Sequence, residues 1–184
     1  MQKILIIILT SGIIILQIIW TITAPKRYWN IKRHLNLERL KTPFIVFISL
    51  IFAILSAFFF PLPQTSADGV LKIIGILLYV LGFFISAWAK LEMRSIWGLP
   101  GQHEIKEQNR IIKSGPFAFS RNPIYLGLML VFGGYCLAIK SYAVFLMIIH
   151  LLIINKIVKK EEQLLEKHFG KDYIKYKNRV PRFI

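Results

Sequence analysis

A series of long apolar blocks, separated by polar stretches, constrains the fold of this chain more than any other feature. The blocks occupy residues 3–24, 43–60, 70–89, 124–139 and 142–158. A transmembrane helix needs about 20 apolar residues to cross the hydrocarbon core of a bilayer. We therefore predict an all-α integral membrane protein with about five transmembrane helices. Its partner is the lipid bilayer, and its single membrane domain spans residues 1–184.

The first block has a competing interpretation as a secretory signal peptide. The block is longer than the apolar core of such a peptide, only Lys3 precedes it, and Pro25 and a basic cluster follow it. These features are typical of a transmembrane helix instead. We predict that this helix has its N-terminus outside the cell.

The formal net charge of +15 over 184 residues would suggest nucleic-acid binding in a soluble protein. Here most basic residues lie in the loop after the first block, in the loop at 90–122 and in the tail at 159–184. Basic residues are enriched in the cytoplasmic loops of membrane proteins. We therefore predict a cytoplasmic C-terminus and no nucleic-acid partner. The short chain without a retention signal favours a prokaryotic cytoplasmic (inner) membrane.

The chain divides into two halves. Residues 1–89 hold the first three predicted helices, and residues 90–184 hold a polar loop, a helical hairpin and a helical tail. The hairpin is expected because only Lys140 and Ser141 separate the last two blocks. The single cysteine, Cys136, excludes an intrachain disulfide and a paired-cysteine metal site, so we expect no metal. The apolar blocks carry no row of charges, which argues against ion transport.

Two polar motifs flank this hairpin. "NRIIKSGPFAFSRNPIYLG" precedes it at 109–127, and "KKEEQLLEKHFGKDYIKYKNRVPRF" follows it at 159–183. Together, in this order, they resemble the isoprenylcysteine carboxyl methyltransferase and phospholipid methyltransferase family of integral membrane enzymes. The resemblance covers about residues 88–184 and implies methyl transfer from S-adenosyl-L-methionine, bound at the cytoplasmic face, to a lipophilic or membrane-partitioned acceptor. After the methyl transfer, the donor would be left as S-adenosyl-L-homocysteine.

The family positions carry over to a set of candidate residues. Arg121, Tyr125 and Glu161 are the candidate catalytic residues. The candidate cofactor-binding residues are Gln102, Asn109, Arg110, Ile111, Ile112, Gly115, Phe117, Arg121, Asn122, Pro123, Ile124, Tyr125 and Glu161.

These residue types suit the parts of the donor. An arginine such as Arg121 can hold a carboxylate through paired hydrogen bonds. Glu161 can accept hydrogen bonds from an ammonium group or from ribose hydroxyls. Ile111, Ile112 and Phe117 can form an apolar slot for adenine, and the ring of Phe117 or Tyr125 can attract the sulfonium. The turn at "KSGP" lets backbone groups approach a ligand closely.

Three positions depart from the family pattern. Asn109 and Asn122 replace histidines, and asparagine does not titrate near neutral pH. Ile157 replaces the arginine that is thought to hold the substrate carboxylate in prenylcysteine methyltransferases. His103, His150 and Lys156 are the remaining candidates for contact with the acceptor, although His150 is also explained as a locally hydrogen-bonded residue.

The identity of the acceptor therefore stays open. A phospholipid amine and a small thiol are the alternatives to a prenylcysteine carboxylate. A catalytically silent membrane scaffold or lipid-binding protein with the same fold is the alternative from another class. The oligomeric state is open as well.

Overall fold

The computed structural model describes residues 2–23, 37–93 and 110–184, with the backbone alone for residues 37–43. Every regular element in these ranges is a helix, which confirms the all-α prediction. The α-helices are α1 (Gln2–Ile22), α3 (Leu37–Phe59), α4 (Asp68–Met93), α5 (Pro123–Ala138), α6 (Met147–Phe169) and α7 (Lys171–Arg179). Two short 3₁₀ helices, η4 (Gly115–Ala118) and η5 (Tyr142–Leu146), precede α5 and α6.

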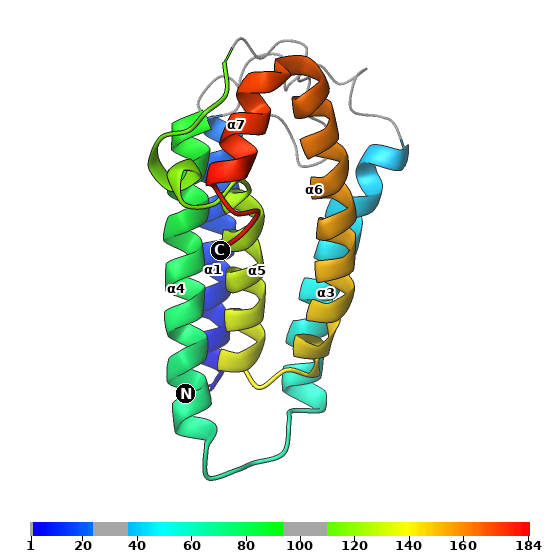
Figure 1. Cartoon of the computed structure of the whole chain (residues 1–184). Coiled ribbons are helices and arrows are strands. Elements are labelled where there is room, and N and C mark those ends of the chain that lie inside the picture. Colours follow the sequence, from blue (N-terminus) through cyan, green and yellow to red (C-terminus); the bar gives the residue numbers. More distant parts are fainter. Residues whose placement is uncertain (1, 24–36, 94–109) are drawn as a thin grey trace.

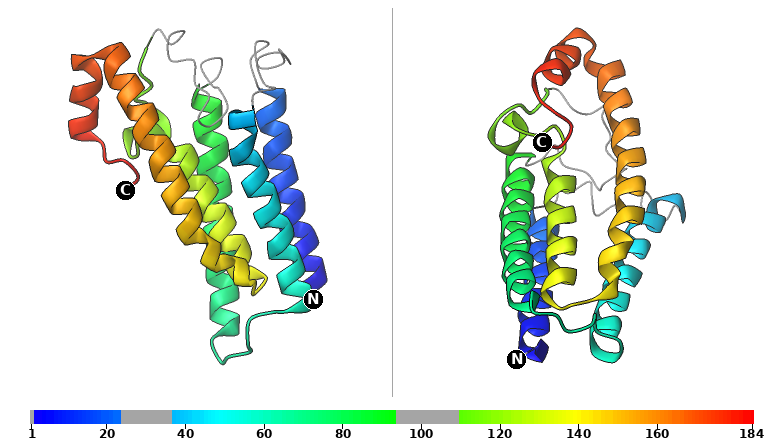
Figure 2. Two further views of the ribbon diagram at one scale, coloured as in Figure 1. Left: turned by 90° about the vertical axis from the view of Figure 1, so that its right-hand side faces the viewer. Right: turned by 60° about the horizontal axis from the view of Figure 1, so that its bottom comes forward.

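The five apolar helices lie side by side and alternate in direction, while α7 folds back over one end of the bundle (Figures 1 and 2). The helical segments Gln2–Ile22, Asp68–Met93 and Tyr142–Phe169 are long and apolar enough to cross a bilayer, and Phe44–Phe59 and Pro123–Ala138 are shorter apolar helices. Many large apolar side chains, such as Ile7, Phe47 and Leu77, point outward. An outward apolar surface is what lipid contact requires, so the chain is a membrane protein.

The most extensive helix contact joins α4 and α5. Glycines make it close, because Gly75 of α4 lies against Gly134 of α5, and Gly82 lies against Gly127. A Cβ atom at Gly82 would lie 2.5 Å from the carbonyl oxygen of Gly127. Small residues in facing positions allow the backbones of membrane helices to approach closely. These glycines recur every seven residues on each helix, so α4 and α5 form a rigid antiparallel pair.

The N-terminal helix is fixed to this pair by two tyrosines. Tyr79 of α4 donates a hydrogen bond to the carbonyl oxygen of Leu9, with 2.6 Å between the oxygens. The hydroxyl of Tyr135 on α5 lies 2.9 Å from that of Thr10. Both partners lie on α1, so the first helix belongs to the same packed unit.

The turn between the last two apolar blocks is bonded to neighbouring helices at the end of the bundle opposite α7. Ser141 accepts a hydrogen bond from the backbone N–H of Ala143 and thereby caps η5. Its hydroxyl also lies 2.5 Å from that of Ser56 on α3. Lys140 forms an ion pair with Asp68 at the start of α4. α5 and α6 run in opposite directions (Figure 1), which confirms the predicted antiparallel hairpin, and the turn between them is bonded to α3 and α4.

The last apolar helix does not end at residue 158, as the apolar block would suggest. α6 continues without interruption to Phe169, and Gly170 then turns the chain into α7 with φ +53°. This backbone conformation is unfavourable for residues with a Cβ atom, which explains the glycine. Because α6 is continuous, the polar sequence after residue 158 stays on the axis of the membrane helix.

Candidate active site

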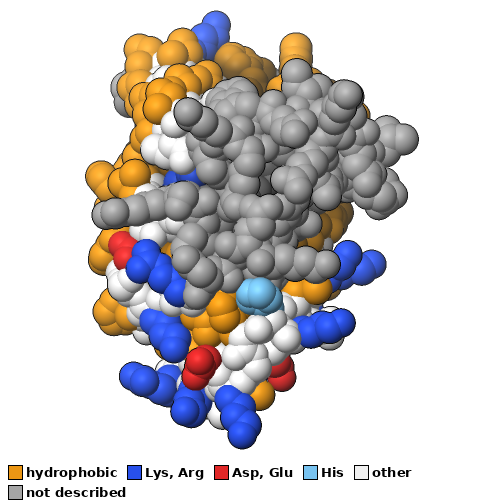
Figure 3. Space-filling model, turned by 90° about the horizontal axis from the view of Figure 1, so that it is seen from above, with side chains coloured by type: hydrophobic (Ala, Val, Ile, Leu, Met, Phe, Trp, Pro, Cys, Tyr) orange, Lys and Arg blue, Asp and Glu red, His pale blue; other side chains and the backbone are white. Residues whose placement is uncertain are grey.

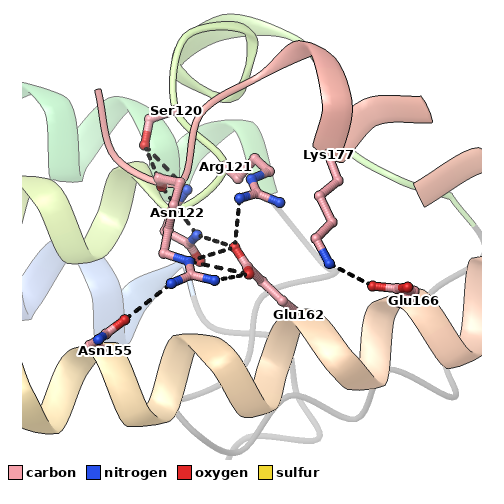
Figure 4. A network of polar contacts seen from close by, with 8 residues as sticks. Ser120, Arg121, Asn122, Asn155, Glu162, Glu166 and Lys177 are labelled. Atoms are coloured by element: carbon pink, nitrogen blue, oxygen red, sulfur yellow. Dashed lines mark hydrogen bonds and ion pairs between the residues drawn. The ribbon is translucent and has the colours of Figure 1, made fainter. Parts of the chain in front are cut away.

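A buried polar cluster lies where the polar end of α6 meets the start of α5 and the C-terminal tail (Figure 4). Its members are Ser120, Arg121, Asn122, Asn155, Glu162 and Arg182. The segment 120–122 precedes α5, whose first residue is the buried Pro123. Proline is favoured in the first turn of a helix, so Pro123 fixes where α5 begins and places Arg121 just before that helix.

Glu162 is the centre of this cluster. Its carboxylate accepts hydrogen bonds from Arg182, with 2.7 Å to Nη2 and 3.2 Å from Nε to each oxygen. It also accepts from Asn122 Nδ2 at 3.3 Å, and it lies 3.4 Å from Arg121 Nη2. One buried carboxylate is thus shared by two guanidinium groups and an amide. Charges are buried at low cost only when they are paired in this way.

Arg121 brings more hydrogen-bond donors to the site than its neighbours use. Its side chain is 9% exposed, and the contact with Glu162 engages only Nη2. The Nε and Nη1 atoms are buried without a hydrogen-bond partner among the described residues. A buried donor without a partner is costly, and an oxyanion is the ligand that satisfies a guanidinium best. The cluster therefore has the chemistry of an anion-binding point.

A second carboxylate, Glu161, lies beside the first on α6 but faces a different partner. Tyr125, in the first turn of α5, donates a hydrogen bond to Glu161 Oε1 at 2.7 Å. Both side chains are buried. Successive residues on a helix point about 100° apart, which is why Glu161 and Glu162 bind different groups. Arg121 and Glu161, both expected to bind the donor, thus have different partners: Arg121 contacts Glu162, and Glu161 contacts Tyr125.

The predicted apolar slot is divided between two clusters. Phe117 and Ile124 are buried with Trp20, Ala89 and Met93, and Ile112 packs against this group. Ile111 instead packs against Tyr173, Tyr176 and Val180 of the tail. The side chain of Ile111 therefore belongs to the docking of α7, and Ile112 and Phe117 remain together.

The turn before α5 is held in place from two sides. Gly115 has φ +57°, and Ser114 donates a hydrogen bond to Glu92 at the end of α4, with 2.5 Å between the oxygens. On the other side, Tyr176 of α7 donates to the carbonyl oxygen of Phe117 at 2.7 Å. The "SGPF" turn is thus fixed between α4 and the tail.

The electrostatics of the tail follow from this docking. Burial raises the pKa of Tyr176 to about 12, and the positive charge of Arg121 opposes that shift. Burial also raises the pKa of Tyr173 above its ordinary value. The hydrogen bond to Glu162 raises the pKa of Arg182, which keeps this guanidinium charged.

Several other predicted site residues have no described contact with the cluster. His150 is buried on α6, where its Nδ1 lies 3.0 Å from the carbonyl oxygen of Leu146 and its ring contacts Phe132. It precedes Glu161 by eleven residues, or about 16 Å along the helix. Lys156 and Arg110 are exposed. Gln102, His103 and Asn109 lie outside the described residues.

The sequence interpretation did not single out four members of the cluster, namely Ser120, Asn155, Glu162 and Arg182. The second motif contains the Glu-Glu pair and the "VPR" segment, which was the available signal. The two glutamates look equivalent in the sequence, and only the packing of α6 against the tail separates their roles.

These observations define an all-helical membrane protein with a buried ionic cluster at one end of its helical bundle. The family model described as phospholipid methyltransferase matches residues 70–172, which is more than half of the chain. The chain therefore belongs to the phospholipid methyltransferase family, a family of membrane methyltransferases. A search of curated proteins found no match.

Proposed function

We propose that this protein transfers a methyl group from S-adenosyl-L-methionine to an acceptor that partitions into the membrane. The observation that carries the proposal is the buried guanidinium of Arg121, whose Nε and Nη1 find no hydrogen-bond partner in the described ranges. It lies in the same corner of the bundle as the Glu161–Tyr125 pair. Membership of a methyltransferase family supplies the reaction class.

The residues present fit the donor. Arg121 would bind its carboxylate, and Glu161 would face its ammonium group or ribose hydroxyls. Ile112 and Phe117, which share a cluster with Ile124, would contact the adenine. The aromatic ring of Tyr125 suits a neighbouring sulfonium. Bound in this way, S-adenosyl-L-methionine would supply an already activated methyl group, so the protein mainly has to align two reactants and exclude water.

Charge distribution supports a cytoplasmic position for this site. Exposed lysine and arginine side chains surround the end of the molecule that carries α7 (Figure 3). They include Lys159, Lys160, Lys167, Lys171, Lys175 and Arg179. Basic residues favour the cytoplasmic side of a membrane. We infer that the cluster faces the cytoplasm of a prokaryotic cell, with the N-terminus outside and five membrane spans.

A phospholipid amine or a small thiol fits this site better than a prenylcysteine carboxylate. Ile157 stands where prenylcysteine methyltransferases carry the arginine that is thought to hold the substrate carboxylate. Lys156 beside it is exposed, and no contact of its side chain with the cluster is present in the described part of the chain. A carboxylate acceptor would therefore lack the arginine that is thought to hold it in the prenylcysteine enzymes.

Methyl transfer is tested with purified protein in nanodiscs and methyl-tritiated donor. Phosphatidylethanolamine, a small thiol and a prenylcysteine are offered separately as acceptors. We expect label in the lipid or the thiol with wild-type protein and none with Arg121→Ala. If well-folded wild-type protein labels none of the three, the proposal is contradicted, and the silent scaffold or lipid-binding protein becomes the better account.

A further inference from the structure

The last residues of the chain bond directly to the turn that carries Arg121. The backbone N–H of Arg121 donates to the carbonyl oxygen of Pro181 at 2.9 Å. The carbonyl oxygen of Arg182 accepts from Ser120 Oγ and from Asn122 Nδ2, both at 3.2 Å. These three bonds join segments about sixty residues apart in the sequence, so the tail is part of the wall of the site.

The side chain of Arg182 extends this connection to α6. Its Nε and Nη2 bind the Glu162 carboxylate, and its Nη1 donates to Asn155 Oδ1 at 3.1 Å (Figure 4). Glu162 and Asn155 are seven residues apart, about two turns of the helix. One planar guanidinium therefore fixes the carboxylate of Glu162 relative to the axis of α6. A lysine could not make these contacts at once, since its charge is a single point.

The tail has a second anchor that does not involve Arg182. Tyr173, Tyr176 and Val180 form a buried cluster with Ile111, Leu165 and Phe169 packed against it. Tyr176 also donates to the carbonyl oxygen of Phe117. Loss of the Arg182 side chain would leave this apolar docking intact. The ionic contacts of Arg182 therefore do something other than attach α7 to the bundle.

We propose that Arg182 is a positioning residue for the Arg121 anion-binding point. By holding Glu162 it keeps that carboxylate shared, so that Glu162 engages only Nη2 of Arg121 and leaves the Nε and Nη1 donors for a ligand. Without Arg182, Glu162 is released to turn toward Arg121 and compete for those donors. In this inference the identity of the ligand rests on the proposed function. The coupling between the C-terminal tail and the turn at residues 120–122 does not depend on that function.

The test compares Arg182→Ala and Arg182→Lys with Arg179→Ala. Arg179 lies three residues earlier and is exposed, so its loss removes the same charge without touching the cluster. Two quantities are measured in detergent, with the unfolding midpoint as a check of folding. The first is backbone hydrogen exchange over residues 114–123 without ligand, and the second is the dissociation constant for S-adenosyl-L-homocysteine.

We expect Arg182→Ala to speed exchange over residues 114–123 and to weaken binding by about tenfold, the loss of roughly one charged hydrogen bond. Arg182→Lys should recover only part of the affinity, and Arg179→Ala should match wild type. If Arg182→Ala matches Arg179→Ala in exchange and in affinity, the positioning role is wrong. If wild-type protein does not bind the ligand, the proposed function fails, and the exchange data still decide whether Arg182 orders the turn.

Discussion

Tyr125 on α5 donates a hydrogen bond to Glu161 on α6, with 2.7 Å between Oη and Oε1. Both side chains are buried, and they join the two helices of the hairpin at the end where Arg121 lies. A phenol paired with a carboxylate holds that carboxylate in one orientation. In the proposed mechanism, this orientation is what lets Glu161 face the ammonium group or the ribose hydroxyls of the donor.

Replacing Tyr125 with phenylalanine tests that role. Tyr125→Phe keeps the ring and removes the donor, so the affinity for S-adenosyl-L-homocysteine should fall by about tenfold. Calorimetry measures the change. Tyr142→Phe is the matched control, because Tyr142 lies at the other end of the bundle, in η5. Unchanged affinity in Tyr125→Phe would show that the Tyr125 hydroxyl has no role in ligand binding.

Loss of the Glu162 charge should destabilise the protein strongly. Glu162→Gln removes the counter-charge of the buried Arg121 and of Arg182, whose side chain is 31% exposed, and should cost about 3 kcal/mol. The free energy of unfolding is measured by SDS titration in mixed micelles. Glu166→Gln is the control, since the pair of Glu166 with Lys177 is 39% exposed on each side and should contribute at most about 1 kcal/mol. Equal effects of the two substitutions would contradict a buried ionic core.

The α4–α5 contact predicts opposite signs for two identical substitutions. Gly82→Ala places a Cβ atom 2.5 Å from the Gly127 carbonyl oxygen and should destabilise the protein by about 1–3 kcal/mol. Gly69→Ala meets no described atom within 4 Å and should be neutral or stabilising by up to about 1 kcal/mol. The same SDS titration measures both. Two equal stabilisations would show that helix propensity, not backbone contact, governs these positions.

The docking of α7 should weaken in alkali. The pKa of Tyr176 is raised to about 12 in the folded state, against about 10 in an unfolded chain. Between these values the folded state holds the proton that the unfolded state has lost, so stability falls as the pH rises from about 10 to 12. Tyr176→Phe removes this titration and should show a shallower fall, by about 2 kcal/mol over that range.

Equilibrium unfolding of wild type and Tyr176→Phe at a series of alkaline pH values measures the difference between the two curves. Parallel curves would mean that the phenol is not buried against the carbonyl oxygen of Phe117. The comparison isolates Tyr176 because lysines and the other tyrosines titrate in both proteins.

The helices were predictable from the sequence, and the contacts of the tail were not. Apolar blocks of membrane-spanning length and a two-residue break predicted the helical hairpin, because these signals are local. The different contacts of Glu161 and Glu162 depend on where the C-terminal tail lies. Arg182 reaches Glu162 only because α7 folds back over the end of the bundle. The seven-residue glycine spacing on α4 and α5 was visible in the sequence, but pairing of the two helices was needed to explain it.

The roles of Arg121 and Glu161 in donor binding remain predictions, and one measurement tests them most directly. S-adenosyl-L-homocysteine is titrated calorimetrically into detergent-purified wild type, Arg121→Ala, Glu161→Ala and Lys156→Ala. Lys156 is exposed on the same helix as Glu161 and serves as the control. We predict micromolar binding by wild type and Lys156→Ala, and loss of binding in the other two. Absence of binding by well-folded wild-type protein, or equal binding by all four, would contradict a donor site at Arg121 and Glu161.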